Sequence, residues 1–507
     1  MKEWLKNAVF YEIYPSSFND SNKDGYGDLI GIIKKLDYLE NLGINAIWLN
    51  PIFDSAFMDG GYDVRDFFKV SKRFGSMEDF ELLISESKKR NINIVLDLVA
   101  GHTSEKNPLF IKSASPKKNK YSQMFIWNDN PWELTEGYKF ISGRYNRMGC
   151  YLVNFFSTQP ALNYGFNEIT HPSWQLSYTH PACLQTREYL KNVIRFWLDK
   201  GVMGFRVDMA DSLVKNDPAK EATILLWNDI TSFMCKEYPE AILISEWSSV
   251  LASKAGFDCD FLLDHHNNPY NQLVRAEEAS KISVFNINGK GDYKKFFNDY
   301  ISWYNQIKDT SCLIGNITCN HDTPRLSPFY NNEQLKIIYT MIITLPGVPF
   351  IYYGDEIGIK YEKDMISKEC GYYRTGTRTP MKWDNSFNYG FSESKKIFLP
   401  QDSGVYSNVL TATNDENSIL NAIKKIIKFK KENEDFNKNL IEYIDTPDFP
   451  FIYKVGSFYI IVNPTNEKKE FDLGYLLDEL FSVNNRLEYA NNKYYIASVS
   501  LSIVKIK

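Results

Sequence analysis

The chain has 507 residues, more than one ordinary hydrophobic core needs, which indicates a large domain with smaller attachments. Hydrophobic residues make up 44% and charged residues 24%, as in soluble globular proteins. The formal net charge of −5 disfavours nucleic acid or an anionic membrane surface as a main partner.

The N-terminal sequence and the cysteines bear on the cellular compartment. Residues 1–6 form no long apolar stretch and are followed by no small-residue cleavage site, so we expect no signal peptide. The most apolar stretch, 337–353, is interrupted by Pro346 and Pro349, which predicts a buried helix, a turn and a strand and not a membrane span. Seven scattered cysteines without C-x-x-C spacing predict reduced thiols. We expect a cytoplasmic protein.

Eight short, largely apolar segments are predicted as strands that are buried on both faces. In chain order they span residues 8–14, 44–50, 94–99, 204–209, 242–247, 257–263, 314–320 and 348–353. Helical patterns, with apolar residues three and four apart, lie between most of them at residues 31–42, 77–90, 187–200, 222–238 and 333–344. Strand alternating with helix in this way predicts an α/β fold, a (β/α)8 TIM barrel.

Two further regions depart from this alternation. A long stretch after the third strand is rich in Pro, Gly, Asn and aromatic residues, and loops of that length are usually functional or form domains. We therefore predict an inserted domain at 101–179 that overhangs the barrel, which itself takes residues 1–100 and 180–436. Beyond an amphipathic helix at 418–433, short alternating segments predict a C-terminal β-sandwich domain at 437–507.

Charged residues and histidines gather at the C-terminal ends of four predicted strands. They are Asp97 and His102, Arg206 and Asp208, Glu246, and His321 with Asp322. A barrel collects these strand ends around one cleft, so residues far apart in sequence are expected to meet there. Separate carboxylates with an arginine and histidines predict acid, base and nucleophile chemistry on a neutral polar substrate.

Several stretches, in order along the chain, resemble glycoside hydrolase family 13, the α-amylase family. They are INAIWLNP (44–51), DLVAGH (97–102), QPALN (159–163), GFRVD (204–208), ISE (244–246), NHD (320–322) and GVPFIYYGDE (347–356). AVFYEIYPSSF (8–18) and RTPMKWD (378–384) resemble most the oligo-1,6-glucosidase, α-glucosidase and trehalose-synthase branch.

The resemblance implies a retaining enzyme that cleaves α-glucosidic bonds through a covalent glycosyl-enzyme. Asp208 would be the nucleophile, Glu246 the general acid and base, and Asp322 a third carboxylate that grips sugar hydroxyls. The residue types agree, because the adjacent Arg206 favours the charged form of Asp208. The apolar wall around Glu246 favours its neutral, proton-donating form. Retention requires the two carboxyl groups to lie about 5–5.5 Å apart.

Further residues are implied to contact the sugar. His102 and His321 would form hydrogen bonds to the same sugar unit, with Arg206 beside the nucleophile. Asp59 and Tyr62 match positions that line the pocket of the terminal sugar, and Arg378 matches an arginine that contacts substrate. Asp97 would orient Arg206 or a histidine instead of transferring a proton.

A separate segment, residues 20–28, has the pattern of a calcium-binding loop. Asp20, Asn22, Asp24 and Asp28 place oxygen ligands at alternate positions, with glycine at the turn. That spacing suits a hard cation, although an Asx-rich turn is the alternative interpretation. The resemblance implies one structural Ca²⁺ here, with the Tyr26 carbonyl as a further ligand.

The chain departs from the family pattern at three places. Gly101 and residues 210–212 replace groups that hold an interdomain calcium in typical α-amylases, so that site is expected to be absent. The usual aspartate of the fifth motif is Ala161. Met209, after the nucleophile, matches neither the Val of α-1,6-selective relatives nor the Ala or Thr of α-1,4-selective ones, so the linkage preference stays open.

Three functional hypotheses follow. The first is hydrolysis of malto- or isomalto-oligosaccharides by an α-glucosidase or α-amylase-type enzyme. The second keeps the chemistry but changes the acceptor, as in a transglycosylase or isomerase such as trehalose synthase or a glucanotransferase. The third is a non-catalytic sugar-binding protein on the same fold, which the presence of all three carboxylates disfavours. We expect a neutral oligosaccharide substrate and a monomer or homodimer.

Overall fold

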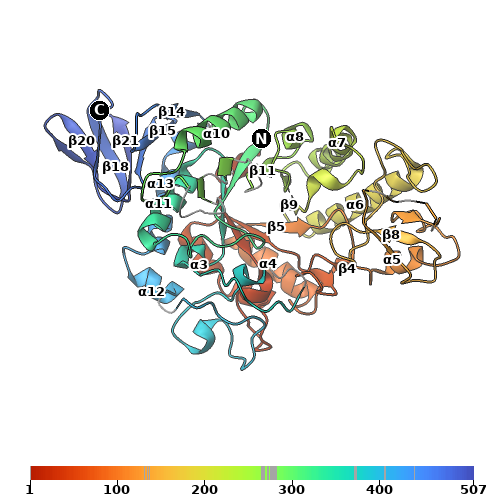
Figure 1. Ribbon diagram of the computed structural model, residues 1–507. Helices are drawn as coiled ribbons and strands as arrows, with labels where there is room; N and C mark the ends of the chain where they lie inside the picture. The colour runs from red at the N-terminus through yellow and green to blue at the C-terminus, as the bar shows by residue number, and fades with distance from the viewer. Residues whose placement is uncertain are drawn as a thin grey trace.

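The computed structural model describes residues 2–130, 132–133, 135, 137–263, 269–270, 273–274, 283–369, 374–404, 407–438 and 440–507. A closed barrel of parallel strands forms its centre (Figure 1). The strands are β1 (Phe10–Ile13), β2 (Ala46–Leu49), β5 (Asn93–Leu98), β9 (Gly204–Val207), β10 (Ile242–Ser245), β11 (Cys259–Phe261), β12 (Leu313–Ile317) and β13 (Val348–Tyr352). Each pairs with the next along the chain, and β13 closes on β1, which confirms the predicted barrel.

The barrel strands end earlier than the sequence predicts, and this decides which side chains reach the rim. β9 ends at Val207 and β10 at Ser245, so Asp208 and Glu246 are the first residues beyond their strands. β5 and β9 pair with Asp97 opposite Arg206, which brings an acidic and a basic side chain together inside the barrel.

Helices surround the barrel (Figure 1). The longer ones are α4 (Met77–Lys89), α6 (Pro181–Asp199), α7 (Glu221–Glu237), α10 (Tyr293–Ile307), α11 (Asn332–Thr344) and α13 (Ile419–Glu432). The shorter ones are α1 (Glu3–Lys6), α2 (Leu29–Ile33), α3 (Leu36–Leu42), α8 (Leu251–Lys254) and α12 (Val409–Asn414). The single helix predicted at 31–42 is in fact the pair α2 and α3, and α10 was not predicted.

The region between β5 and α6 lies to one side of the barrel (Figure 1). It contains α5 (Pro108–Ser113) and a small antiparallel sheet of β6 (Trp127–Asn128), β8 (Cys150–Leu152) and β7 (Phe140–Ser142). A small separate core lies within it, made of Ile126, Leu152, Ala161, Phe166 and Trp174, while its other buried residues, such as Phe110 and Tyr151, join the main core. A hairpin that was not predicted, β3 (Phe53–Ser55) with β4 (Val64–Val70), lies beyond β2.

The C-terminal region contains two antiparallel sheets. One has β14 (Ile441–Ile444), β15 (Phe451–Val455), β16 (Phe458–Asn463), β21 (Ser500–Ile506) and β18 (Leu477–Val483). The other has β17 (Lys469–Phe471), β20 (Lys493–Ile496) and β19 (Glu488–Ala490). Apolar residues from both sheets share one core, as in a β-sandwich.

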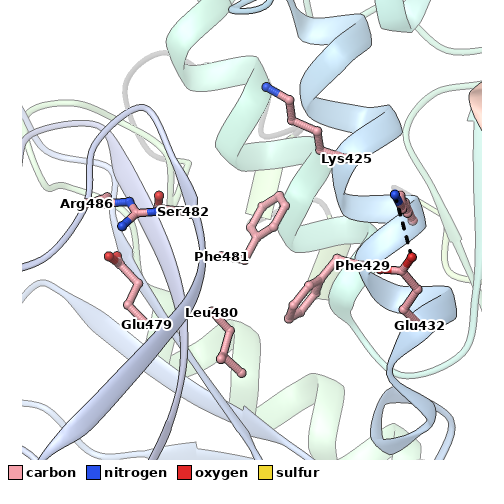
Figure 2. A pocket seen from close by; sticks show the side chains of 9 residues that line it. Lys425, Phe429, Glu432, Glu479, Leu480, Phe481, Ser482 and Arg486 are labelled. Atoms are coloured by element: carbon pink, nitrogen blue, oxygen red, sulfur yellow. Dashed lines mark ion pairs between the residues drawn. The ribbon is translucent and has the colours of Figure 1, made fainter.

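The C-terminal sheets pack against α10, α11 and α13 of the barrel. Phe429 of α13 and Phe481 of β18 face each other with ring centroids 5.3 Å apart (Figure 2). Charged side chains, among them Lys425 and Arg486, surround this aromatic contact. The contact therefore belongs to the seam between two units and not to the strand-end rim of the barrel.

The cysteines and the apolar helices bear on the expected cellular compartment. The six cysteines that the structure describes are free thiols, and Cys370 lies outside the described residues. In the described part of the chain, none of the helices combines the length and the apolar character that a membrane crossing demands.

Candidate active site

A cavity of 1040 Å³ contains most of the predicted site residues. Six of them line it: Asp59, Tyr62, His102, Asp208, Glu246 and Asp322. Residues that were not predicted as site residues complete the wall: Met58, Phe155, Phe156, Met209, Asp211, Trp247, Ser367, Lys368, Glu369 and Arg374. Three predicted residues do not line the cavity but contact side chains that do: Arg206, His321 and Arg378.

Arg206 joins the two carboxylates that are predicted to perform the reaction. Its Nη1 lies 3.2 Å from Asp208 Oδ1 and 2.8 Å from Asp97 Oδ1, and its Nη2 lies 2.7 Å from Glu246 Oε1. The guanidinium is fully buried. Asp208 and Glu246 therefore occupy the two terminal nitrogens of one guanidinium, an arrangement that suits the close carboxyl pair of a retaining glycosidase.

The three carboxylates around Arg206 outnumber its single positive charge. Burial, together with the carboxylates of Glu246 and Asp97, raises the pKa of Asp208, although Arg206 opposes this rise. Arg206 thus favours the charged form of Asp208, as expected, but burial and the neighbouring carboxylates outweigh it. One guanidinium faces three carboxylates, so Asp208 holds a proton more firmly than an exposed aspartate does. An acid and nucleophile pair needs one protonated and one ionised carboxyl group.

The backbone beyond the nucleophile orients Glu246. Met209 has a left-handed conformation, with φ 42°, which is uncommon for a residue other than glycine. Its N–H donates to Glu246 Oε2 over 3.0 Å. Backbone strain beside the nucleophile therefore fixes the second carboxylate, as is common at functional sites.

Asp322 is held by three cationic side chains. Its Oδ1 accepts hydrogen bonds from Arg374 Nη1 (2.9 Å) and Arg378 Nη2 (3.0 Å), and its Oδ2 lies 3.2 Å from His321 Nε2. Although burial acts in the opposite direction, His321 and Arg374 hold the pKa of Asp322 well below its usual range. Asp322 is therefore an ionised hydrogen-bond acceptor that faces the cavity.

The two histidines have opposite protonation states. Burial lowers the pKa of His102 to about 4, and its Nε2 lies 3.1 Å from the Tyr62 carbonyl oxygen, so this ring is neutral. Burial also disfavours a charge on His321, but Asp322 and Glu12 raise its pKa to about 9. Protein partners occupy both nitrogens of His321, which does not line the cavity. The expectation that His321 directly contacts the sugar therefore differs from the structure.

The unpredicted hairpin region supplies one wall of the cavity. The Tyr62 hydroxyl donates to Asp97 Oδ2 (2.8 Å), and its ring stacks on His321 with centroids 5.3 Å apart. Asp59 Oδ2 accepts from Gln159 Nε2 over 2.7 Å. Gly60, with φ 58°, allows its backbone to approach Arg378, because a Cβ atom at this position would lie 2.8 Å from Arg378 Nη1.

Sequence reasoning chose Arg378 as the arginine that contacts substrate, whereas Arg374 lines the cavity. Arg374 bridges Asp322 and Asp59, with Nη2 2.5 Å from Asp59 Oδ1. Arg378 is buried, and its Nε donates to the His321 carbonyl oxygen over 2.9 Å. Two arginines four residues apart were visible in the sequence, but only the folded loop distinguishes them.

The loop at 20–28 is closed by its own backbone. Asp20 Oδ1 accepts from the N–H groups of Asn22 and Lys23, and Asp28 Oδ2 accepts from the Ser21 N–H. Its oxygen donors suit Ca²⁺ by chemical type. Within the described residues, however, no three acidic, His or Cys side chains meet where they could share a metal ion. This conformation is that of an Asx-rich turn.

A partly buried lysine, Lys215, joins the inserted region to the barrel near Gly101. Lys215 Nζ donates to Asn154 Oδ1 (3.1 Å) and to the Ser212 carbonyl oxygen (2.6 Å), and burial lowers its pKa to about 8. A Cβ atom at Gly101 would lie 2.8 Å from Asn154 Nδ2. The glycine therefore leaves room for Asn154, whose amide also reaches His102 Nδ1 over 3.3 Å.

Comparison with known proteins shows which family the chain resembles. The family model described as "Alpha amylase, catalytic domain" matches residues 12–439. A glucan 1,6-alpha-glucosidase of Streptococcus pneumoniae is 30% identical, covering 92% of this chain and 93% of its own. An alpha-amylase 3 of Dictyoglomus thermophilum is 30% identical, covering 99% of this chain and 94% of its own. A trehalulose synthase structure from Pseudomonas mesoacidophila covers both chains fully, with a TM-score of 0.82 and 23% identity.

The chain therefore belongs to the α-amylase family, as its motifs indicated. It is an enzyme, a glycoside hydrolase of the α-glucosidase type.

Proposed function

We propose that this glycoside hydrolase cleaves α-1,4 or α-1,6 bonds of short malto- or isomalto-oligosaccharides with retention of anomeric configuration. The pairing of Asp208 and Glu246 on one buried guanidinium is the observation that supports this most strongly. The cavity also lies at the upper end of the size range of small-molecule sites, which suits a few sugar units.

In the first chemical step, Asp208 attacks the anomeric carbon while Glu246 protonates the leaving glycosidic oxygen. This forms a covalent bond between the sugar and Asp208 and releases the leaving sugar as an alcohol. Glu246, now ionised, then removes a proton from water, which attacks the same carbon and restores the Asp208 carboxylate. Asp322 binds sugar hydroxyls, and the charges of Arg374 and Arg378 keep it ionised.

The charges of the cavity favour a neutral substrate. Its wall contains carboxylates at Asp59, Asp208, Asp211, Glu246, Asp322 and Glu369, but cations only at Lys368 and Arg374 among the described lining residues. Arg374 is already paired with Asp59 and Asp322. An anionic sugar such as a phosphorylated one would meet net repulsion in this cavity.

Linkage preference is tested by products. The two curated relatives above are named for different activities, and Met209 matches neither residue pattern. Time courses on maltose, isomaltose, sucrose, trehalose and maltotriose should show glucose released from at least one of the first two. If all five sugars remained intact, hydrolysis of short α-gluco-oligosaccharides would be rejected.

Transfer to a second sugar is the alternative, and Phe155 and Phe156 favour considering it. Both come from the inserted region and line the cavity with apolar rings, which would favour a sugar over water as the acceptor in the second step. A trehalulose synthase also shares the fold. Accumulation of a new disaccharide from maltose or sucrose, without matching free glucose, would establish this alternative.

We further propose that the loop at 20–28 binds one structural Ca²⁺ when the ion is present. Support comes from its alternating oxygen donors, which would have to exchange some backbone hydrogen bonds for the ion. Calcium should raise the melting temperature after treatment with EGTA, and Asp24→Ala should abolish that rise. An unchanged melting temperature in wild type would leave only the Asx-rich turn.

Finally, we propose that the enzyme works in the cytoplasm as a monomer or homodimer on a neutral oligosaccharide. The free thiols support a reducing compartment. Cell fractionation tests the location, and light scattering of the purified protein tests the oligomeric state.

A further inference from the structure

Glu12 is a buried carboxylate that no strand-end pattern predicted. It lies on β1 and is 1% exposed. Its Oε1 lies 2.7 Å from His321 Nδ1 and accepts a hydrogen bond from Asn50 Nδ2 over 3.1 Å. Glu12 does not line the cavity, so any effect on the reaction must pass through the histidine.

His321 lies between two carboxylates. Glu12 faces Nδ1, and Asp322 Oδ2 faces Nε2 at 3.2 Å. The Tyr62 hydroxyl, 2.7 Å from Nε2, donates its own proton to Asp97 and so can only accept from the ring. These acceptors favour a proton on both nitrogens, although the Asn50 Nδ2 donor also lies 3.1 Å from Nδ1.

The remaining neighbours of the His321 ring do not offer Glu12 another cation in direct contact. Trp48 contacts the ring edge, with centroids 5.8 Å apart, and the Asn50 amide is neutral. Two guanidinium groups lie near this cluster: Arg378 donates to the His321 carbonyl oxygen and to Asp322, and Arg206 pairs with Asp97. Neither cation contacts Glu12 directly, so the imidazole ring is its cationic partner among the described contacts.

We propose that Glu12 is a positioning residue that keeps the His321 side chain as an imidazolium and thereby fixes Asp322 at the cavity wall. The proposal rests on the proposed function, in which Asp322 binds sugar hydroxyls. A neutral ring would turn a lone pair toward one of two carboxylates, at 2.7 or 3.2 Å. Asp322 would then lose one of its three cationic partners. The raised pKa of His321, about 9, agrees with this geometry.

The consequence is a pH limit on activity. Above the pKa of His321, the ring becomes neutral, Asp322 is held less firmly, and kcat/KM falls. Replacing Glu12 by glutamine keeps the shape and the acceptor oxygen but removes the charge. In E12Q the ring should lose its proton at a pH lower by about 1 to 3, because an opposite charge at this range shifts a pKa by that amount.

The experiment combines ring titration with kinetics. The ¹⁵N signals of the His321 imidazole, assigned by their loss in H321Q, are followed against pH without substrate. Wild type should titrate near pH 9, and E12Q lower. The alkaline limb of kcat/KM should move by the same amount, while E12D, which keeps the carboxylate, should restore part of it.

Glu356 provides a matched control. It is also a fully buried glutamate, with its Oε1 accepting hydrogen bonds from the Tyr11 and Tyr38 hydroxyls, both at 2.6 Å. E356Q should lower stability without moving the alkaline limb. The proposal would be overturned if E12Q left the His321 titration unchanged, or if both variants merely reduced activity equally at every pH.

The ring titration also separates this proposal from the proposed function. If E12Q does not fold, wild type alone remains decisive, since a neutral His321 at pH 7 would contradict the proposal. If the protein cleaved no α-glucoside, the titration could still show an imidazolium, and only the function would be lost.

Discussion

At the scale of single residues, the site is governed by a shortage of positive charge. Arg206 alone serves Asp97, Asp208 and Glu246, whereas three cations contact Asp322. These are His321, which also pairs with Glu12, Arg374, which also pairs with Asp59, and Arg378. Burial and the neighbouring carboxylates therefore raise the pKa of Asp208, whereas His321 and Arg374 hold the pKa of Asp322 below its usual range.

Replacing the nucleophile should separate activity from stability. Asp208→Asn removes the attacking oxygen, and kcat on an aryl α-glucoside should fall by at least about 10³-fold. It also removes one of three carboxylates that crowd Arg206, so the melting temperature should be equal or higher. Near-normal turnover of D208N would refute the role of Asp208.

The pKa of His321 makes stability depend on pH. The folded state holds this proton up to about pH 9, whereas a free histidine releases it near pH 6.5. The folded protein therefore binds more protons than the unfolded chain between these values, and this contribution to stability is lost as the pH rises through them. In H321Q the melting temperature should fall less steeply between pH 6.5 and 9 than in wild type. An identical slope in the two proteins would contradict the ion-pair assignment.

At the scale of elements, apolar runs predicted the barrel strands and the strand ends predicted the site, whereas loops and some helices were not predicted from the sequence. Eight buried strands stand out in sequence because both faces are apolar, and this alone places Asp208 and Glu246 at the rim. The β3–β4 hairpin gives a weak signal, since its two strands pair with an irregular register. The helix predicted at 31–42 breaks between α2 and α3. The buried residues of α10, such as Tyr293, Phe296 and Tyr300, do recur at helical spacing, so this helix was predictable and was missed.

The seam between α13 and the C-terminal sheets should affect stability but not catalysis. Phe429 packs on Phe481 (Figure 2) and also contacts Phe436 and Phe458. Phe429→Ala should lower the free energy of unfolding by about 2–3 kcal/mol, less than a fully buried phenylalanine would. Chemical denaturation measures this loss, and kcat/KM should remain unchanged. The exposed neighbour Lys428→Ala is the control, and an equal loss in both variants would argue against the aromatic seam.

At the scale of the whole molecule, the barrel brings side chains from distant parts of the chain to one cavity. The order of the motifs was sufficient to predict the fold, the family and the three carboxylates of the cavity, but not most of the other residues of its wall. Pairwise contacts such as Arg374 with Asp59, or Glu12 with His321, were not predictable, because they depend on how loops close over the rim. The Asx-rich form of the loop at 20–28 shows the same limit, since spacing alone does not fix where side chains point.

The central claim is that Asp208 forms a covalent bond with the sugar while Glu246 transfers protons. The most direct measurement is mass spectrometry of the enzyme after reaction with a 5-fluoro-α-glucosyl fluoride, followed by peptide mapping. We predict a stable increase in mass by one fluoroglucosyl unit, located on the peptide that contains Asp208 and absent in D208N. A label on another residue, or rapid turnover with inversion of the anomeric centre and no labelled enzyme, would contradict the account.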